Sequence, residues 1–177
     1  MKSNYAPLSK PTIVFHWLAG LFFLTVLGLG LYMGELPKGP AKFEIMDWHK
    51  SLGFAFLFIA LARVVWRLYE GHLPSLSESH TWQDTLAKGI HVMLLLATVM
   101  MPVSGMMMSI GGGHGLDFFG AILVEGGDKI DWLGGLGHEV HEIGANLVIL
   151  ALLLHIAGAL KHQFKDKDGL LSRMLGR

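Results

Sequence analysis

Four long apolar stretches constrain the fold of this chain more than any other feature of its sequence. They cover residues 12–33, 51–66, 90–110 and 143–160, and none contains an acidic side chain. An α-helix rises about 1.5 Å per residue, so about 20 apolar residues are needed to cross the hydrocarbon core of a bilayer. The second stretch reaches this length if its helix begins near His49 and its arginine side chains extend to the interface. The sequence therefore predicts helices that span a membrane.

The predicted fold is all-α: a single domain, residues 1–177, that forms an integral membrane four-helix bundle. Its helices are expected at about residues 12–33, 49–69, 86–110 and 139–162. Pro102 interrupts the third helix, which membrane helices tolerate when neighbouring groups satisfy the freed carbonyl. Residues 111–137 form a glycine-rich loop with several apolar side chains, so part of this loop is expected against the outer membrane interface.

The positions of lysine and arginine predict the orientation, because these residues are enriched in cytoplasmic loops. In a bundle of four helices, the two termini and the loop at residues 72–83 share one side. Ten of the 14 basic residues lie there: Lys2, Lys10, Arg63, Arg67, Lys88, Lys161, Lys165, Lys167, Arg173 and Arg177. The other side has four: Lys38, Lys42, Lys50 and Lys129. Both termini are therefore expected in the cytoplasm.

Ten histidines and no cysteine are the main chemical signal in this apolar chain. The lack of cysteine excludes disulfides, thiolate-ligated iron–sulfur clusters and the covalent attachment of a c-type haem. The net charge is zero, so no excess of basic residues argues for nucleic-acid binding. Any haem must therefore be held by side chains alone.

Four histidines fall at depths that match in pairs. His141 and His155 are separated by almost four helical turns, so they share one helix face and lie about 21 Å apart along the axis. His49 lies at the outer depth of His141, and His16 lies at the inner depth of His155. The predicted pairs, His49–His141 and His16–His155, could each bind the two axial faces of one haem iron. Small residues near them would let a porphyrin approach the helices closely: Gly20, Gly53, Gly144 and Gly158.

Three more residues near the inner end are candidate contacts. Arg63 follows His49 at the same helical interval, and its guanidinium could neutralise haem propionates; the alternative is simple anchoring on the cytoplasmic side. His91 is a candidate propionate contact, and His162 is a candidate quinone contact or proton carrier. Either could instead replace His155 or His16 as a ligand, or be a plain interfacial histidine.

Other chemistries fit the sequence less well. His138-Glu-Val-His141 lacks the spacing of the zinc-protease motif. The methionines at positions 100, 101 and 106–108 follow no regular copper-ligand spacing, and adaptable packing explains them better. A histidine in a membrane helix also commonly bonds a neighbouring helix. A non-redox protein whose histidines bind a transition metal or carry protons therefore stays an alternative.

Several motifs recur in a specific order along the chain. They include Phe15-His16-Trp17, Asp47-Trp48-His49, Arg63-Val-Val-Trp-Arg67, Leu86-Ala-Lys-Gly-Ile-His91, His141-Glu-Ile-Gly-Ala-Asn-Leu147, Leu154-His155 and Gly169-Leu-Leu-Ser-Arg-Met174. In this order and spacing the chain resembles the prokaryotic cytochrome b561 family over nearly its whole length, least so in residues 111–137. The resemblance implies two haem b groups in the bacterial inner membrane, with axial ligands His16, His49, His141 (rather than His138) and His155.

The resemblance also implies an activity, that of a superoxide:ubiquinone oxidoreductase. Superoxide would give its electron at the outer face, ubiquinone would be reduced, and His162 falls where a quinone contact is needed. The predicted outer side carries nine acidic residues against four lysines, a net charge that repels an anion at long range. The family also includes haem subunits that exchange electrons between a dehydrogenase or hydrogenase partner and the quinone pool. An acidic outer face would suit a basic donor protein.

Overall fold

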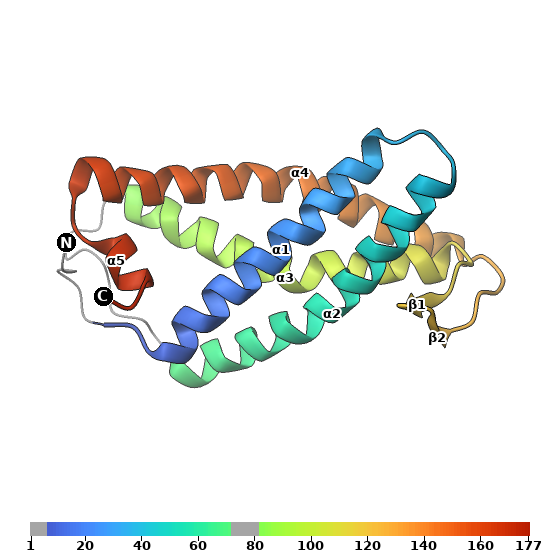
Figure 1. Ribbon diagram of the computed structural model, residues 1–177, viewed down its shortest axis with the longest axis horizontal. Coiled ribbons are helices and arrows are strands. Elements are labelled where there is room, and N and C mark those ends of the chain that lie inside the picture. The colour runs from blue at the N-terminus through green and yellow to red at the C-terminus, as the bar shows by residue number, and fades with distance from the viewer. Residues whose placement is uncertain (1–6, 72–81) are drawn as a thin grey trace.

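A computed structural model describes residues 7–71 and 82–177 of the chain. Most of the predicted loop at residues 72–83, and the predicted cytoplasmic Lys2, lie outside the described residues. Within them, four long helices run back and forth along one axis (Figure 1): α1 (Lys10–Glu35), α2 (Pro40–Glu70), α3 (Trp82–Gly111) and α4 (Asp131–Lys161). The all-α membrane bundle predicted from the sequence is confirmed, and all four helices are long and apolar enough to cross a bilayer.

The helices extend beyond the predicted spans, and local sequence explains where they begin. Ser9 caps α1, its hydroxyl accepting a hydrogen bond from the backbone N–H of Thr12 at 3.3 Å. The prediction that α2 begins near His49 is wrong, because Pro40 occupies the first helical position, where its fixed φ is favourable. The predicted start of α4 near residue 139 is also too late. Asp131 begins that helix, placing an acidic side chain at the positive end of the helix dipole.

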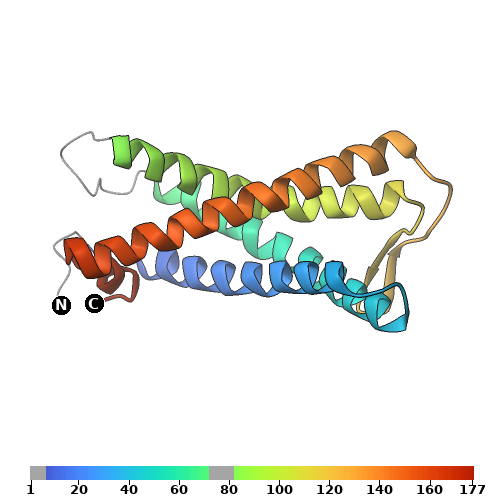
Figure 2. The same cartoon turned by 90° about the horizontal axis from the view of Figure 1, so that it is seen from above.

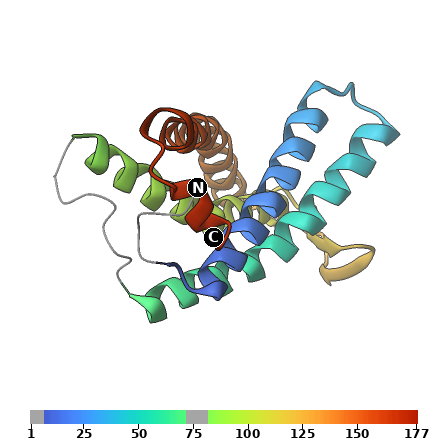
Figure 3. The ribbon, with the colours of Figure 1, turned by 60° about the vertical axis from the view of Figure 1, so that its left-hand side comes forward.

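The helices pack as two antiparallel pairs, α1 with α2 and α3 with α4, and α2 also packs against α3 (Figures 2 and 3). Between α1 and α2, Phe56 and Ala60 of α2 bury Ala19 of α1. Between α3 and α4 the backbones touch: a Cβ built on Gly111 would lie 2.1 Å from the backbone nitrogen of Gly134. Glycine permits this approach, as is common between membrane helices.

Large apolar side chains cover the outside of the bundle. Leu21, Val65 and Leu153 are each more than 60% exposed, although they lie in the apolar segments of α1, α2 and α4. A soluble protein rarely exposes so large a continuous apolar surface, whereas lipid tails cover it at no cost. The exposed surface therefore agrees with a location in the membrane.

A two-stranded hairpin follows α3 at one end of the bundle, and the sequence analysis did not predict it. Strands β1 (Leu116–Phe118) and β2 (Ala121–Val124) pair antiparallel. The expectation that part of this loop lies against the outer membrane interface stays a prediction, and β1 itself packs against α2. Leu116 is buried, and the backbone N–H of Phe119 donates to the hydroxyl of Ser51 on α2 at 3.0 Å. The side chains of β2, by contrast, are exposed.

The chain ends at the opposite end of the bundle, where α1 begins and α2 finishes (Figure 1). After α4 the chain forms a π-helical turn, η1 (His162–Asp166), and a short helix, α5 (Leu170–Met174). The indole N–H of Trp17 on α1 donates to the backbone carbonyl of Met174 at 2.8 Å. This bond holds the C-terminal segment against the beginning of α1.

Candidate functional site

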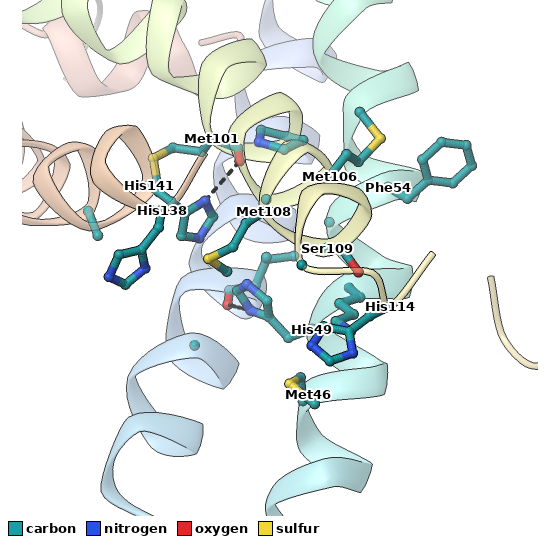
Figure 4. A pocket seen from close by; sticks show the side chains of 18 of the residues that line it. Met46, His49, Phe54, Met101, Met106, Met108, Ser109, His114, His138 and His141 are labelled. Carbon is teal, nitrogen blue, oxygen red and sulfur yellow. Dashed lines mark hydrogen bonds between the residues drawn. The ribbon is translucent and has the colours of Figure 1, made fainter. Parts of the chain in front are cut away.

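The structure brings His49 of α2 and His141 of α4 together near the hairpin. Their ring centroids are 6.1 Å apart, with the ring planes at 82°. We call them the hairpin-end pair. Both side chains line a cavity of about 700 Å³ between the helices (Figure 4). A cavity of this size is within the range that holds a ligand or cofactor.

Hydrogen bonds orient both rings of the hairpin-end pair. Nδ1 of His49 lies 3.0 Å from the carbonyl oxygen of Val26, and Nδ1 of His141 lies 3.1 Å from the carbonyl oxygen of Met101, the dashed line in Figure 4. A carbonyl oxygen can only accept, so in each ring Nδ1 carries the proton and donates it. Each Nε2 then has a free lone pair, which is the form of imidazole that binds a metal.

Two glycines that the sequence analysis missed make room for these rings. A Cβ at Gly30 on α1 would lie 2.9 Å from Cε1 of His49, and a Cβ at Gly105 on α3 would lie 3.4 Å from Cε1 of His141. The glycines predicted to let a porphyrin approach are different ones: a Cβ at Gly20 would meet nothing within 4 Å, and Gly53 lines the cavity. Gly30 could have been found, because it follows His16 at the interval that separates His141 from His155.

His16 of α1 and His155 of α4 form a second pair toward the end that carries the C-terminus, here called the termini-end pair. Their ring centroids are also 6.1 Å apart, with the planes at 56°. The ring of His91 on α3 lies 5.2 Å from that of His155. Arg63 of α2 is close enough to interact electrostatically with His16, His91 and His155. The structure thus gathers Arg63 and His91, both predicted site residues, around this pair.

His162 lies apart from both pairs, at the junction of α4 and η1. Its Nδ1 is 2.6 Å from a carboxylate oxygen of Asp168 and 3.4 Å from one of Asp166. Within the described residues, its ring makes no contact with the rings of either pair. His162 is therefore a separate polar group at the end of the fourth helix, oriented by a carboxylate.

The spacing within each pair fits a haem iron. An imidazole nitrogen binds a metal at about 2.0 Å and the ring radius is about 1.1 Å, so two coaxial imidazoles on one metal have centroids about 6.2 Å apart. Both observed separations, 6.1 Å, match this value. Neither α1 with α4 nor α2 with α4 is among the closely packed helix pairs of the described residues. At the hairpin-end pair, the cavity between the helices gives a flat macrocycle room.

Polar side chains at the hairpin end complete the cavity. Lys50, Lys129, His114 and His138 line it, and Figure 4 labels the two histidines. His138 projects from α4 and contacts Glu142 at 3.3 Å on the exposed helix surface. Asp131 and Ser109 also line the cavity, and the rest of its wall is mostly apolar, which suits a largely apolar ligand.

Comparisons with known proteins give a consistent result. The family model described as prokaryotic cytochrome b561 matches residues 8–177. Over 172 residues, 92% of this chain and 88% of the relative, the chain is 32% identical to cytochrome b561 homolog 2 of Escherichia coli strain K12. It is 24% identical to cytochrome b561 homolog 1 of the same organism over 170 residues, 96% and 97% of the two chains. It is also 32% identical to cytochrome b562 of Cereibacter sphaeroides over 127 residues, 72% of this chain and 65% of that protein.

Proposed function

Because this chain belongs to the prokaryotic cytochrome b561 family, and is therefore a haem-binding electron-transport protein of the membrane, we propose that it holds two haem b groups. His49 and His141 are the proposed axial ligands of one haem, and His16 and His155 those of the other. The observation that carries this assignment is the equal separation of the two pairs, 6.1 Å between centroids, which is the span of two imidazoles on one metal.

The same measure argues against His91 as an axial ligand in place of His16. The rings of His91 and His155 are only 5.2 Å apart, which is less than two imidazoles need on opposite sides of one iron. We assign His91 and Arg63 to the propionate groups instead. A guanidinium satisfies a carboxylate through two parallel hydrogen bonds, and its positive charge offsets the propionate charge in a medium of low dielectric.

The proposed reaction takes electrons from superoxide at the hairpin end and delivers them to ubiquinone at the termini end. Two superoxide ions each lose one electron and leave as dioxygen, and ubiquinone gains two electrons and two protons to become ubiquinol. When bound, the haem irons supply the one-electron redox chemistry. The chain supplies the depth of the two sites, their ligands and the apolar surroundings. This orientation places the hairpin outside and both termini in the cytoplasm.

Two lysines support an anionic substrate at the hairpin end. The acidic residues predicted on this side repel superoxide at long range, but Lys50 and Lys129 line the cavity that holds the hairpin-end pair. Their positive charge acts at short range, where screening by salt is weakest. We propose that they attract superoxide over the last few ångströms. Lys129→Gln should slow the reduction of the protein by superoxide, and Lys38→Gln, on the loop between α1 and α2, should not.

His162 is the proposed quinone contact at the other end. Asp168 accepts a hydrogen bond from its Nδ1 at 2.6 Å, which leaves Nε2 to face a quinone oxygen. In the doubly protonated imidazolium form, which the carboxylate stabilises, Nε2 carries the proton that passes to the quinone, and the ring then takes a new proton from water. Asp168→Asn should slow the reoxidation of the reduced protein by ubiquinone and leave its reduction by superoxide unchanged. If both rates fall equally, the aspartate acts on the fold and not on the quinone.

A second candidate function is favoured by the acidic residues of the hairpin end. A basic donor protein, or a dehydrogenase or hydrogenase partner, would be attracted by the same charge that repels superoxide. Stopped-flow mixing distinguishes the two functions. Reduction by superoxide, followed by reoxidation with ubiquinone, supports the first. Reduction no faster than that of an unrelated cytochrome favours the partner subunit.

Haem content tests the ligand assignment directly. His49→Ala and His141→Ala should each remove one haem and leave the other, and His16→Ala and His155→Ala should remove the other one. His162→Ala is the matched control, because its ring is oriented by Asp168 and lies apart from both pairs. Loss of both haems, or of neither, in the four ligand variants would refute the two-site assignment. Protein purified without any haem would instead support a non-redox function.

A further inference from the structure

The two histidine pairs differ in what surrounds them. Both rings of the hairpin-end pair donate from Nδ1 to a backbone carbonyl, that of Val26 or that of Met101. Within the described residues, no acceptor lies at hydrogen-bond distance from a ring nitrogen of His16 or His155. The termini-end pair has the positive charge of Arg63 nearby instead.

Ser104 adds a second acceptor at the hairpin end. Its hydroxyl oxygen lies 3.1 Å from Nδ1 of His141, and its own O–H donates to the carbonyl of Met101 at 2.9 Å. His141, Met101 and Ser104 therefore form a closed triangle of hydrogen bonds. Ser104 is 1% exposed, so no water competes with these bonds and the ring is held in one orientation.

These bonds affect a metal through its ligand. An imidazole that donates strongly from Nδ1 has more electron density on Nε2 and is a more basic ligand. A more basic ligand stabilises the ferric state over the ferrous state and so lowers the reduction potential. At the termini end the effect is opposite, because a nearby guanidinium destabilises the more positive ferric state.

Resting on the proposed two-haem function, we propose that Ser104, with the carbonyl groups of Met101 and Val26, tunes the hairpin-end pair so that the haem held there has the lower potential. Ser104 is a positioning residue in this scheme, since it acts through His141. Arg63 raises the potential at the termini end. Together the two environments make electron transfer from the hairpin end to the termini end favourable, which is the direction that the proposed reaction requires.

Potentiometric titration followed by visible absorption tests this proposal on the full-length protein with its haems. The wild-type protein should show two components. The component of lower potential should be missing in His49→Ala and present in His16→Ala. The reverse result would overturn the proposal. If these variants do not lose one haem each, the ligand assignment fails instead, so the two failures are distinguishable.

Substitution of Ser104 tests the tuning itself. Ser104→Ala should shift the component of lower potential upward. If the ferric-to-ferrous ratio at a fixed potential changes tenfold, the shift is about 59 mV. Ser104→Thr keeps the hydroxyl and should keep the wild-type potential. Thr98→Val is the matched control, because the hydroxyl of Thr98 donates to a backbone carbonyl of the same helix, that of Leu95, at 2.6 Å.

Arg63 provides the complementary test. Arg63→Gln should lower the reduction potential of the higher-potential component and leave that of the other component unchanged. Arg67→Gln, one helical turn further along, should change neither potential. An unchanged potential in Ser104→Ala, or a shift of the same size in Thr98→Val, would overturn the role of Ser104. If Arg63→Gln lowers the reduction potentials of both components, the proposal that the charge of Arg63 acts only at the termini end is overturned.

Discussion

Replacing Gly30 with alanine should remove the haem proposed at the hairpin end without unfolding the protein. The added Cβ would lie 2.9 Å from Cε1 and 3.3 Å from Nδ1 of His49, whereas ordinary contacts begin at 3.4 Å. The ring must therefore move by at least about 0.5 Å. Metal–ligand distances are held to about 0.2 Å, so a movement of this size breaks the bond or the bond's geometry.

The fold itself should tolerate this substitution. Alanine is preferred over glycine in the interior of a helix by about 0.5–1 kcal/mol, which offsets part of the strain at His49. The assay is the ratio of haem to protein in the purified protein, which should fall from two toward one. Loss of an interaction that orients a ligand typically weakens metal binding about 10- to 100-fold, and a displaced ligand should do at least as much.

Two other glycines give a graded control. A Cβ at Gly28, also on α1, would meet nothing within 4 Å, so Gly28→Ala should keep both haems. A Cβ at Gly105 would lie 3.4 Å from Cε1 of His141, so Gly105→Ala should disturb the haem spectrum less than Gly30→Ala does. The reasoning is refuted if Gly30→Ala retains both haems with an unchanged spectrum.

Two further substitutions test the packing around the site. Gly111→Ala would place a Cβ 2.1 Å from the backbone nitrogen of Gly134. Overpacking costs about 1–3 kcal/mol or more, so this variant should have a lower thermal unfolding midpoint in detergent. A Cβ at Gly135 would meet nothing within 4 Å, so Gly135→Ala should keep the wild-type midpoint. Ser51→Ala removes the acceptor of the Phe119 N–H at 3.0 Å and should cost about 1 kcal/mol locally, so hydrogen exchange at that amide should rise about fivefold. Equal midpoints in the two glycine variants, or unchanged exchange at Phe119, would contradict these accounts of the packing.

The spans and the spacing of the histidines were predictable because both depend on short-range periodicity. A bilayer requires a minimum length of apolar helix, and the regular rise of a helix places His141 and His155 on one face. The residues at which the helices begin could be predicted less well from the sequence. Pro40 favours a helix start on its own, but the predicted helix began only at about residue 49.

The surroundings of the histidines depended on which helices lie side by side. Nothing near His49 in the sequence indicates that the carbonyl of Val26 accepts a hydrogen bond from its ring. Ser104 and Met101, which bond His141, lie on a different helix from it. The bond between Phe119 of the hairpin and Ser51 likewise joins two elements that are distant in the sequence. Sequence periodicity places a side chain at a depth and on a face, because a helix repeats locally. Only the tertiary structure decides which groups that side chain meets, because those groups come from distant parts of the chain.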